Sequence, residues 1–276
     1  MCSPGVCFSA RVKDQPLAVN TRIRLKDFDP AHDGGLDKDK AKKKTREYAE
    51  RIGELQELLY ANSGHAVLLL FQGMDASGKD GAVRSVLEHV NPVGVQTANF
   101  KVPSEEERAH DFLWRVHKAV PRYGYIGVFN RSHYEAVLVE RVLKIVPKAV
   151  WSKRYAQIVN YEQFLVENRI VLLKFFLHIS KKEQAERFAD RLAQPHKHWK
   201  FSPSDLKTRE QWDAYMQAYQ DMINATSHAR ARWHIVPANR NWVRDFVIAR
   251  TVVRVMEALK MKWPEPKEDL SSFKII

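Results

Sequence analysis

The sequence predicts an α/β fold in three layers, a parallel five-stranded sheet between two layers of helices. Two observations predict it. Strand and helix patterns alternate from residue 38 onward, which is typical of an open parallel sheet with helices on both faces. Several predicted strands are continuous apolar runs, and such runs mark strands that are covered on both faces. We find no internal repeat and no linker long enough to divide the chain.

The first segment, residues 1–37, shows no sustained period and is predicted to be an extended arm. Within it, residues 22–26 would form either a short edge strand or a basic flap. A helix over 38–61 follows, because Tyr48, Ile52 and Leu55 recur at helical spacing. The polar residues 62–64, which end in a glycine, terminate it.

The remainder, 38–276, is expected to form a single domain. Apolar runs predict five strands, at 65–71, 93–101, 123–129, 169–179 and 233–236. Ser104 and Glu107 form a capping box, which opens a helix predicted to extend to Val120. Helical spacing predicts the other helices, at 77–89, 137–145, 155–167, 181–193, 206–230 and 242–259.

Composition limits the function. The chain has 276 residues, with 45 Lys and Arg against 33 Asp and Glu, a formal net charge of +12. This excess favours a polyanionic partner such as nucleic acid, an acidic membrane or a phosphate-rich ligand. Cys2 and Cys7 are the only cysteines, which excludes a disulfide framework and a four-cysteine zinc site. Without an apolar run of roughly 18 residues or a secretory signal, we expect a cytoplasmic protein with no membrane partner.

The sharpest motif is Gly73-Met-Asp-Ala-Ser-Gly78-Lys79, which fits G-x-x-x-x-G-K between the first strand and a helix. Its small residues let backbone N–H groups turn inward, and the helix N-terminus adds a positive end. Lys79 supplies a mobile cation for a transferring phosphate. The motif predicts a P-loop kinase-like fold, the alternative being a structural glycine-rich turn. The expected phosphate-binding residues are Gly73, Met74, Ala76, Ser77, Gly78 and Lys79.

Two carboxylates depart from the strict motif. Asp80 stands where Ser or Thr is expected, and Asp75 lies inside the loop. Both would repel phosphate unless a cation lay between, and Mg²⁺ prefers such hard oxygen ligands. We therefore expect Mg²⁺ as cofactor, held by Asp75 and Asp80, with both residues and Lys79 catalytic. Alternatively, Asp80 only caps the helix or stabilises its dipole.

A second cluster, Asn130-Arg-Ser-His-Tyr-Glu135, ends the third strand, and ligands bind at the carboxyl ends of such strands. Arg131 suits bidentate contact with a phosphate and is expected to be catalytic. Asn130 occupies the place where an NTP-hydrolysing protein would carry a magnesium-binding Asp. Asn130 and Glu135 are candidate nucleotide-binding residues, although Glu135 could instead hold metal-bound water or simply favour a helix start. His133 is either a general acid or base or a helix cap.

The helix after the fourth strand carries Arg187 and Arg191 on one face, four residues apart. Paired arginines fit a helical lid, at about 181–210, that closes over transferring phosphates. The alternative is an exposed solubilising helix whose own Glu183 and Glu186 neutralise the arginines. Lys101, in the unit between the phosphate loop and the third strand, is a further candidate phosphate contact.

In combination these motifs resemble the family-2 polyphosphate kinases, over most of the chain from about residue 24 to 263. The residues that carry the resemblance lie at 55–61, 71–81, 100–104, 111–115 and 130–135. It implies a P-loop kinase fold with a helical lid, and Mg²⁺-dependent phosphoryl transfer between inorganic polyphosphate and adenine nucleotides. It carries the core site over onto Asp75, Lys79, Asp80 and Arg131, with Arg187 and Arg191 from the lid.

The form of the 130–135 motif resembles the subgroup that phosphorylates both AMP and ADP, and the resemblance implies a homodimer or homotetramer. Two other functions stay open from the residues alone. An ATP-dependent nucleoside-monophosphate kinase would share the loop and the lid. A nucleic-acid binder would explain the charge, but aromatic residues are not interleaved with the basic clusters, so we expect no nucleic-acid partner.

Overall fold

The computed structural model describes residues 22–270 and residue 273. Five parallel strands form one sheet in the order β2-β3-β1-β4-β5, which confirms the predicted parallel five-stranded sheet. The strands are β1 (Ala66–Gln72), β2 (Val95–Asn99), β3 (Ile126–Asn130), β4 (Ile170–His178) and β5 (Trp233–Pro237). The first strand of the sequence is therefore the central strand, with β3 and β4 on its two sides.

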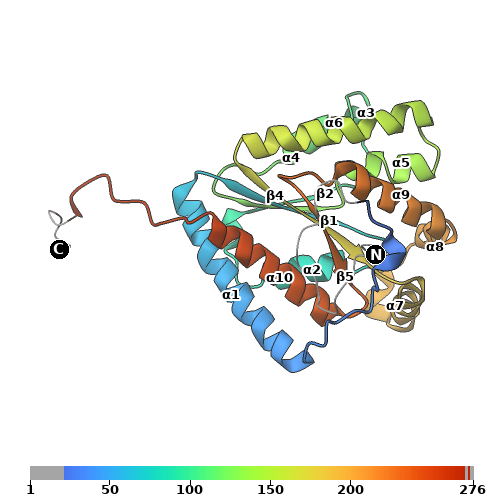
Figure 1. The fold of residues 1–276 in the computed structure, drawn as a ribbon, viewed down its shortest axis with the longest axis horizontal. Coiled ribbons are helices and arrows are strands. Elements are labelled where there is room, and N and C mark those ends of the chain that lie inside the picture. The colour runs from blue at the N-terminus through green and yellow to red at the C-terminus, as the bar shows by residue number, and fades with distance from the viewer. Residues whose placement is uncertain (1–21, 271–272, 274–276) are drawn as a thin grey trace, which may run out of the picture.

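Helices cover both faces of the sheet, in three layers (Figure 1). One face carries α4 (Trp114–Ala119), α6 (Lys148–Glu167) and α9 (Trp212–Thr226), and the other carries α1 (Lys38–Asn62), α2 (Lys79–Val86) and α10 (Asn241–Ala258). The remaining helices are α3 (Glu105–Arg108), α5 (Val139–Val142), α7 (Lys181–Ala193) and α8 (Pro203–Glu210). Four 3₁₀ turns are η1 (Leu25–Asp27), η2 (Pro92–Gly94), η3 (His133–Ala136) and η4 (Pro195–Lys200).

The central strand shows why its sequence is apolar throughout. All seven residues of β1 are buried. Because side chains alternate between the faces of a strand, Leu68 and Leu70 join the core under α6 and α9, whereas Val67, Leu69 and Phe71 join the core under α1 and α10. Helices on both faces thus require apolar residues at consecutive positions.

Several predicted helices differ in extent from the structure: α6 begins at Lys148 and not at 155, α5 covers only Val139–Val142 of the predicted 137–145, and two others are divided. The helix predicted from Ser104 to Val120 is divided into α3 and α4, and the backbone N–H of Leu113 donates to the Asp111 carboxylate at 2.9 Å. An aspartate that accepts from the backbone two residues on favours a turn over a helix. The helix predicted over 206–230 is divided into α8 and α9 at Gln211, and α9 ends at Thr226.

Residues 22–26 form neither an edge strand nor a basic flap. Ile23 and Leu25 are buried, and their backbone N–H groups donate to Asn224 Oδ1 at 2.8 Å and Gln220 Oε1 at 3.0 Å. Both acceptors are on α9, so two apolar residues at alternate positions fasten this segment to a helix instead of to a sheet edge. The rest of the predicted arm, 1–21, lies outside the described residues.

Within residues 22–270 and 273, no helix has both the length and the apolar character needed to cross a bilayer.

Candidate active site

The loop between β1 and α2 is built from residues that tolerate unusual backbone conformations. Gly78 has φ +97°, and Ala76 has φ +60°, a left-handed conformation that is uncommon outside glycine. A Cβ on Gly73 would lie 2.7 Å from the Leu177 carbonyl oxygen at the end of β4, and one on Gly78 would collide with the guanidinium of Arg244. Glycine at both positions lets the loop curl tightly against its neighbours.

Lys79, the first residue of α2, reaches back across this loop. Its Nζ donates to the carbonyl oxygens of Gly73 at 2.8 Å and Met74 at 3.2 Å. Burial and, to a smaller extent, the nearby positive charge of Arg131 lower the pKa of Lys79 to about 8, against the opposing effect of Asp75. The ammonium group is therefore held inside the loop by carbonyl acceptors that a phosphate could replace.

Arg131 connects the end of β3 to the loop. Its Nη2 lies 2.8 Å from Asp75 Oδ1, and its Nη1 lies 3.9 Å from Glu135 Oε2. Arg131 has φ +63°, so the first residue after β3 turns sharply. Gln72 Nε2 donates to Glu135 Oε1 at 3.1 Å, and burial raises the pKa of Glu135. Asp75, Arg131 and Glu135 thus form one charged group beside the loop.

The second carboxylate, Asp80, is held from the same strand end. Asn130 Nδ2 donates to Asp80 Oδ1 at 2.7 Å. The register of the sheet explains both contacts, because Asn130 pairs with Phe71, the residue before the last of β1. The G-x-x-x-x-G-K motif and the Asn130–Arg131 motif, separate in sequence, therefore meet side chain to side chain.

These carboxylates fit a magnesium ion. Among the described residues no group of three or more His, Cys, Asp or Glu side chains is arranged to hold a metal. Mg²⁺ does not need such a cage, since it is usually bound by one or two carboxylates together with waters and substrate phosphates. Asp75 in the loop and Asp80 at the start of α2 supply that donor set.

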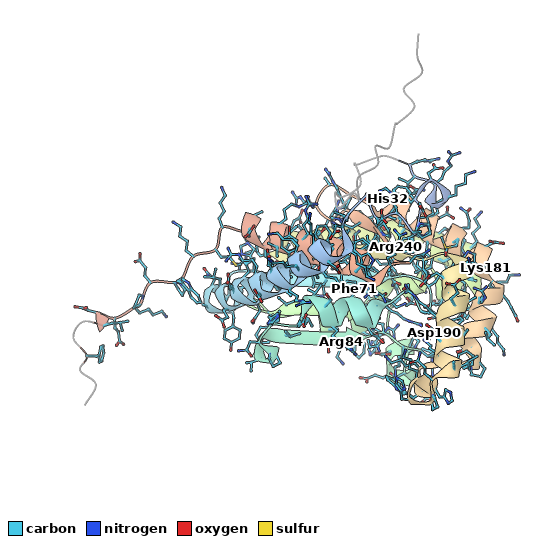
Figure 2. The ribbon with its side chains drawn as sticks, turned by 90° about the horizontal axis from the view of Figure 1, so that it is seen from below. His32, Phe71, Arg84, Lys181, Asp190 and Arg240 are labelled. Carbon is cyan, nitrogen blue, oxygen red and sulfur yellow. The ribbon has the colours of Figure 1, made fainter. Side chains whose placement is uncertain are left out.

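The helix α7 contacts the loop through two side chains. Arg187 donates to the carbonyl oxygens of Ala76 at 2.8 Å, Ala238 at 2.7 Å and Asn239 at 2.9 Å. Gln184 Nε2 donates to the Asp75 carbonyl oxygen at 2.9 Å. Figure 2 marks the segments concerned, with Phe71 near the end of β1, Arg84 on α2, and Lys181 and Asp190 on α7.

Two predicted phosphate contacts lie outside this arrangement. Arg191 Nη1 donates to the Lys200 carbonyl oxygen at 3.0 Å and lies 3.5 Å from Asp205 Oδ2, so it faces η4 and α8 and not the loop. Lys101 is exposed after β2, and its carbonyl oxygen accepts from Arg115 Nη1 at 2.9 Å. Of the two arginines predicted to share a helix face, only Arg187 touches the phosphate loop in this structure.

Arg244 and Gln184 were missed by the sequence interpretation. Arg244, on α10, is 3% exposed and lies against Gly78 and Gly81, where it donates to Asn241 Oδ1 and Asp245 Oδ1, both at 2.8 Å. It belongs to no motif and lies far along the chain, so no spacing signals it. Gln184 lies one turn before Arg187, a spacing that places both on one face of α7, and this could have been inferred.

His133 neither caps the turn nor faces the site. Ser132 caps η3 through Tyr134 N, while His133 is buried with Nε2 3.3 Å from Glu162 Oε1, and burial lowers the pKa of His133. The buried Glu162 carboxylate also accepts from Tyr134 Oη at 2.6 Å and Lys174 Nζ at 2.6 Å, and it lies 3.1 Å from His228 Nε2. The second half of the motif therefore anchors the first half to the core.

A comparison with known families decides what this geometry belongs to. The family model described as polyphosphate kinase 2 matches residues 35–264. The chain belongs to the polyphosphate kinase 2 family. This confirms the resemblance drawn from the motifs and covers both motifs that form the site.

Relatives and a solved structure agree with this membership in polyphosphate kinase 2. An AMP/ADP-polyphosphate phosphotransferase of Meiothermus ruber is 48% identical over 260 residues, 93% of this chain and 97% of that protein. An ADP-polyphosphate phosphotransferase of Rhodopseudomonas palustris is 47% identical over 80% of each chain. The crystal structure of polyphosphate kinase 2 from Arthrobacter aurescens superposes with a TM-score of 0.90 at 38% identity, covering 93% of this chain and 92% of that one.

Proposed function

We propose that this chain transfers phosphoryl groups between inorganic polyphosphate and adenine nucleotides, converting AMP to ADP and ADP to ATP with Mg²⁺. The observation that carries the proposal is the joining of Asp75 to Arg131 and Asp80 to Asn130 around the G-x-x-x-x-G-K loop, in a member of polyphosphate kinase 2. The similarity to the M. ruber phosphotransferase, whose name includes both AMP and ADP, supports the choice of acceptors.

The catalytic contribution of the chain would be positioning and charge neutralisation, since phosphoryl transfer needs little covalent chemistry from the protein. Loop N–H groups and Lys79 would hold the phosphate that is transferred. Arg131 would give up its ion pair with Asp75 and bind the equatorial oxygens of the phosphate instead, where a guanidinium binds in a bidentate manner. Mg²⁺ bound by Asp75 and Asp80 would neutralise further charge on the phosphates. A nucleotide phosphate oxygen would then attack in line.

Two further features belong to this proposal. Residues 181–210 would act as a lid, with Arg187 nearest to the transferring phosphate and Arg191, Lys101 and the net positive charge guiding the polyphosphate chain. Asn130 and Glu135 would contact the nucleotide.

We also propose that the protein works in the cytoplasm, where its nucleotide substrates are found, as a homodimer or homotetramer; light scattering would measure that assembly.

The decisive experiment omits ATP. Purified protein is given polyphosphate, Mg²⁺ and either AMP or ADP, and nucleotide products are separated by anion-exchange chromatography. ADP should form from AMP and ATP from ADP, and Lys79→Met should abolish both. Product formation from AMP only when ATP is the donor would instead identify a nucleoside-monophosphate kinase and overturn the proposal.

A further inference from the structure

A cavity lies at the amino ends of the strands, opposite the ends that carry the phosphate loop. Its volume is about 440 Å³, and it is bordered by the residues at the amino ends of β1, β4 and β5 together with the ends of α6 and α10. The phosphate loop follows the carboxyl end of β1. A strand of seven residues at 3.3 Å per residue places the two sites roughly 20 Å apart, so the cavity is not a part of the site described above.

The cavity borders an uncovered edge of the sheet. β4 pairs with β1 from Ile170 onward, but β5 first pairs with β4 at Lys174. In the described chain, residues 170–173 therefore have a strand on one side only. Alternate residues of a strand turn their N–H and C=O groups to the same side, so donors and acceptors of β4 face the cavity instead of a fifth strand.

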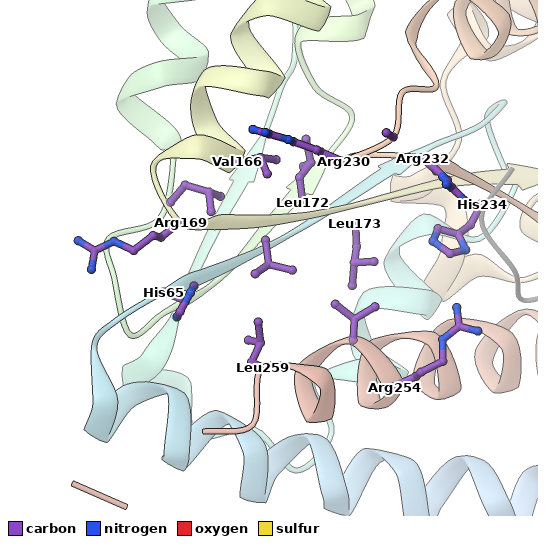
Figure 3. A pocket seen from close by; sticks show the side chains of 14 residues that line it. His65, Val166, Arg169, Leu172, Leu173, Arg230, Arg232, His234, Arg254 and Leu259 are labelled. Carbon is purple, nitrogen blue, oxygen red and sulfur yellow. The ribbon is translucent and has the colours of Figure 1, made fainter. Parts of the chain in front are cut away.

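Apolar side chains lie above and below this edge. Figure 3 shows Leu173 on the side of β4 that faces α10, where Leu259 lies, and Leu172 on the other side, where Val166 lies. A ligand that continues the plane of the sheet would thus lie between two aliphatic surfaces. A flat ring whose rim carries hydrogen-bonding groups fits that space better than a bulky or flexible body.

The polar part of the lining is cationic. Arg169, Arg230, Arg232 and Arg254 all border the cavity, and none of its lining residues in the described chain is Asp or Glu. Arg230 pairs with Glu167 at 2.9 Å, and Arg169 stacks on the Tyr123 ring at 4.7 Å. Such a concentration of guanidinium groups favours an anion, and above all a phosphate, which guanidinium binds in a bidentate manner.

Arg232 supplies an independent sign of a ligand. Its Nε is buried and has no hydrogen-bond partner among the described residues, a state that native proteins rarely leave uncompensated. The C-termini of helices attract cations, which accounts for Arg169 directly after α6, but Arg232 lies just before β5 and at no helix end. In Figure 3, Arg232, His234 and Arg254 lie toward the same end of the cavity.

We propose that this cavity is a second nucleotide site, which binds a nucleoside phosphate away from the catalytic loop. The base lies between the aliphatic side chains of β4 and α10 and presents its donor and acceptor edge to the backbone of residues 170–173. The phosphate lies at the end formed by Arg232 and Arg254. The volume suits a ligand of this size, since small-molecule pockets range from about 300 to 1,000 Å³.

Photolabelling tests the assignment directly. Whole protein is irradiated with 8-azido-ADP, and labelled peptides are mapped by mass spectrometry. We expect label on peptides that contain residues 166–173 or 254–259, separate from label near the phosphate loop. Arg232→Gln and the exposed Arg254→Gln should each lower labelling of the cavity about tenfold at subsaturating probe. Arg46→Gln, the same change on an exposed residue of α1, should leave it unaltered.

Competition identifies the ligand class. Unlabelled ADP should displace the probe from the cavity at least about tenfold better than inorganic tripolyphosphate, which has the charge but no base. Equal competition would overturn the nucleoside assignment. Absence of cavity label at millimolar probe, or label that persists in both arginine variants, would overturn the site. Exclusion of the probe only in an oligomer would assign the cavity to a contact between copies and also overturn it.

The result is separable from the catalytic proposal. Arg254→Gln should retain the phosphotransfer rate with saturating substrates, because Arg254 lies outside the catalytic loop. If Arg232→Gln fails to fold, Arg254→Gln alone decides the matter. A chain that lacks phosphotransfer but labels at the cavity would overturn the proposed reaction and leave the second site in place.

Discussion

Asp80 accepts a hydrogen bond from Asn130 Nδ2 at 2.7 Å, and this bond ties the first turn of α2 to the end of β3. An amide at position 130 therefore satisfies a carboxylate that would otherwise repel phosphate. The same contact makes a substitution at position 130 a test for a bound metal. An aspartate there would place its carboxylate within hydrogen-bond distance of the Asp80 carboxylate.

Asn130→Asp should destabilise the metal-free protein by about 1–2 kcal/mol, because a donor is lost and like charges meet. Added Mg²⁺ should reduce this difference in unfolding free energy between the variant and the parent, since it binds carboxylate oxygens. Urea unfolding with and without Mg²⁺ measures both effects. Asn62→Asp loses comparable bonds to Leu58 and Lys262 carbonyl oxygens and should not respond to Mg²⁺. If Mg²⁺ leaves the difference in unfolding free energy between Asn130→Asp and the parent unchanged, this would argue against a metal at Asp80.

Asp75→Asn should lower the phosphotransfer rate at least about a hundredfold while the fold persists, because a neutral amide is a poor magnesium ligand and holds Arg131 less strongly. Steady-state rates and thermal unfolding of the same preparations provide the comparison. Asp190→Asn, the same change on an exposed residue of α7, should retain the rate. Near-normal turnover of Asp75→Asn would exclude its metal role.

Arg187→Gln and Arg191→Gln should differ, although sequence places them on one helix face. Arg187 bonds the carbonyl oxygen of Ala76 in the loop, whereas Arg191 bonds that of Lys200. We expect Arg187→Gln to lower kcat about tenfold or more and stability by about 2 kcal/mol, with a clearly smaller loss of kcat for Arg191→Gln. Equal losses of kcat would show that the helix acts as a unit in a closed state.

The buried pair of Glu162 and Lys174 should behave unlike a surface pair. Lys174 Nζ lies 2.6 Å from Glu162 Oε2, and both side chains are fully buried. Lys174→Met leaves a buried carboxylate without its cation, which costs about 3–5 kcal/mol. The exposed Arg51 and Glu54, also 2.6 Å apart, provide the control, and Arg51→Met should cost at most about 1 kcal/mol. Chemical denaturation measures the loss of unfolding free energy in both variants. Similar losses in Lys174→Met and Arg51→Met would contradict the expected difference between a buried and an exposed pair.

Acid should destabilise the folded chain through His178, because burial disfavours the charged imidazolium. His178 Nε2 lies 3.1 Å from the Phe28 carbonyl oxygen, and burial lowers the pKa of His178 to about 4. The unfolded chain, with a pKa near 6.5, then binds the proton first, so stability is complete above pH 6.5 and falls toward pH 4. The group accounts for about 2 kcal/mol of loss by pH 5.

Equilibrium unfolding at several pH values gives the test. His178→Gln should remove that part of the pH dependence and leave the contribution of the other buried groups. If the variant and the parent lose stability in parallel between pH 7.5 and 5, His178 does not titrate as described.

The sheet and the phosphate loop could be predicted because their signals are local. Seven consecutive buried residues in β1 and a glycine at each end of the loop follow from sheet burial and backbone sterics. For Asp75 and Asp80 the sequence predicts a shared metal site but not their hydrogen-bond partners. Those partners, Arg131 and Asn130, are set by the register between β1 and β3. Arg244 could not be predicted at all, because its place against Gly78 results from the packing of α10.

The breaks within two predicted helices had a different origin. Apolar spacing continues through Asp111 and Gln211, so periodicity alone extends each helix. A side chain that competes for a backbone N–H ends the first pattern, as the bond from Leu113 to Asp111 shows. The segment around Ile23 was misjudged because its partners, Asn224 and Gln220, are distant in sequence.

Lys79, Arg131 and Arg187 each already hold an acceptor of the protein itself: loop carbonyl oxygens, Asp75, and carbonyl oxygens that include that of Ala76. A lone orthophosphate must displace these occupants one at a time and gains little from each exchange. A polymer brings many equivalent groups on a single tether, so every displacement after the first proceeds at high effective concentration. We therefore expect cations that already hold acceptors of the protein to favour a long polyphosphate donor over free orthophosphate, without a separate device that measures chain length.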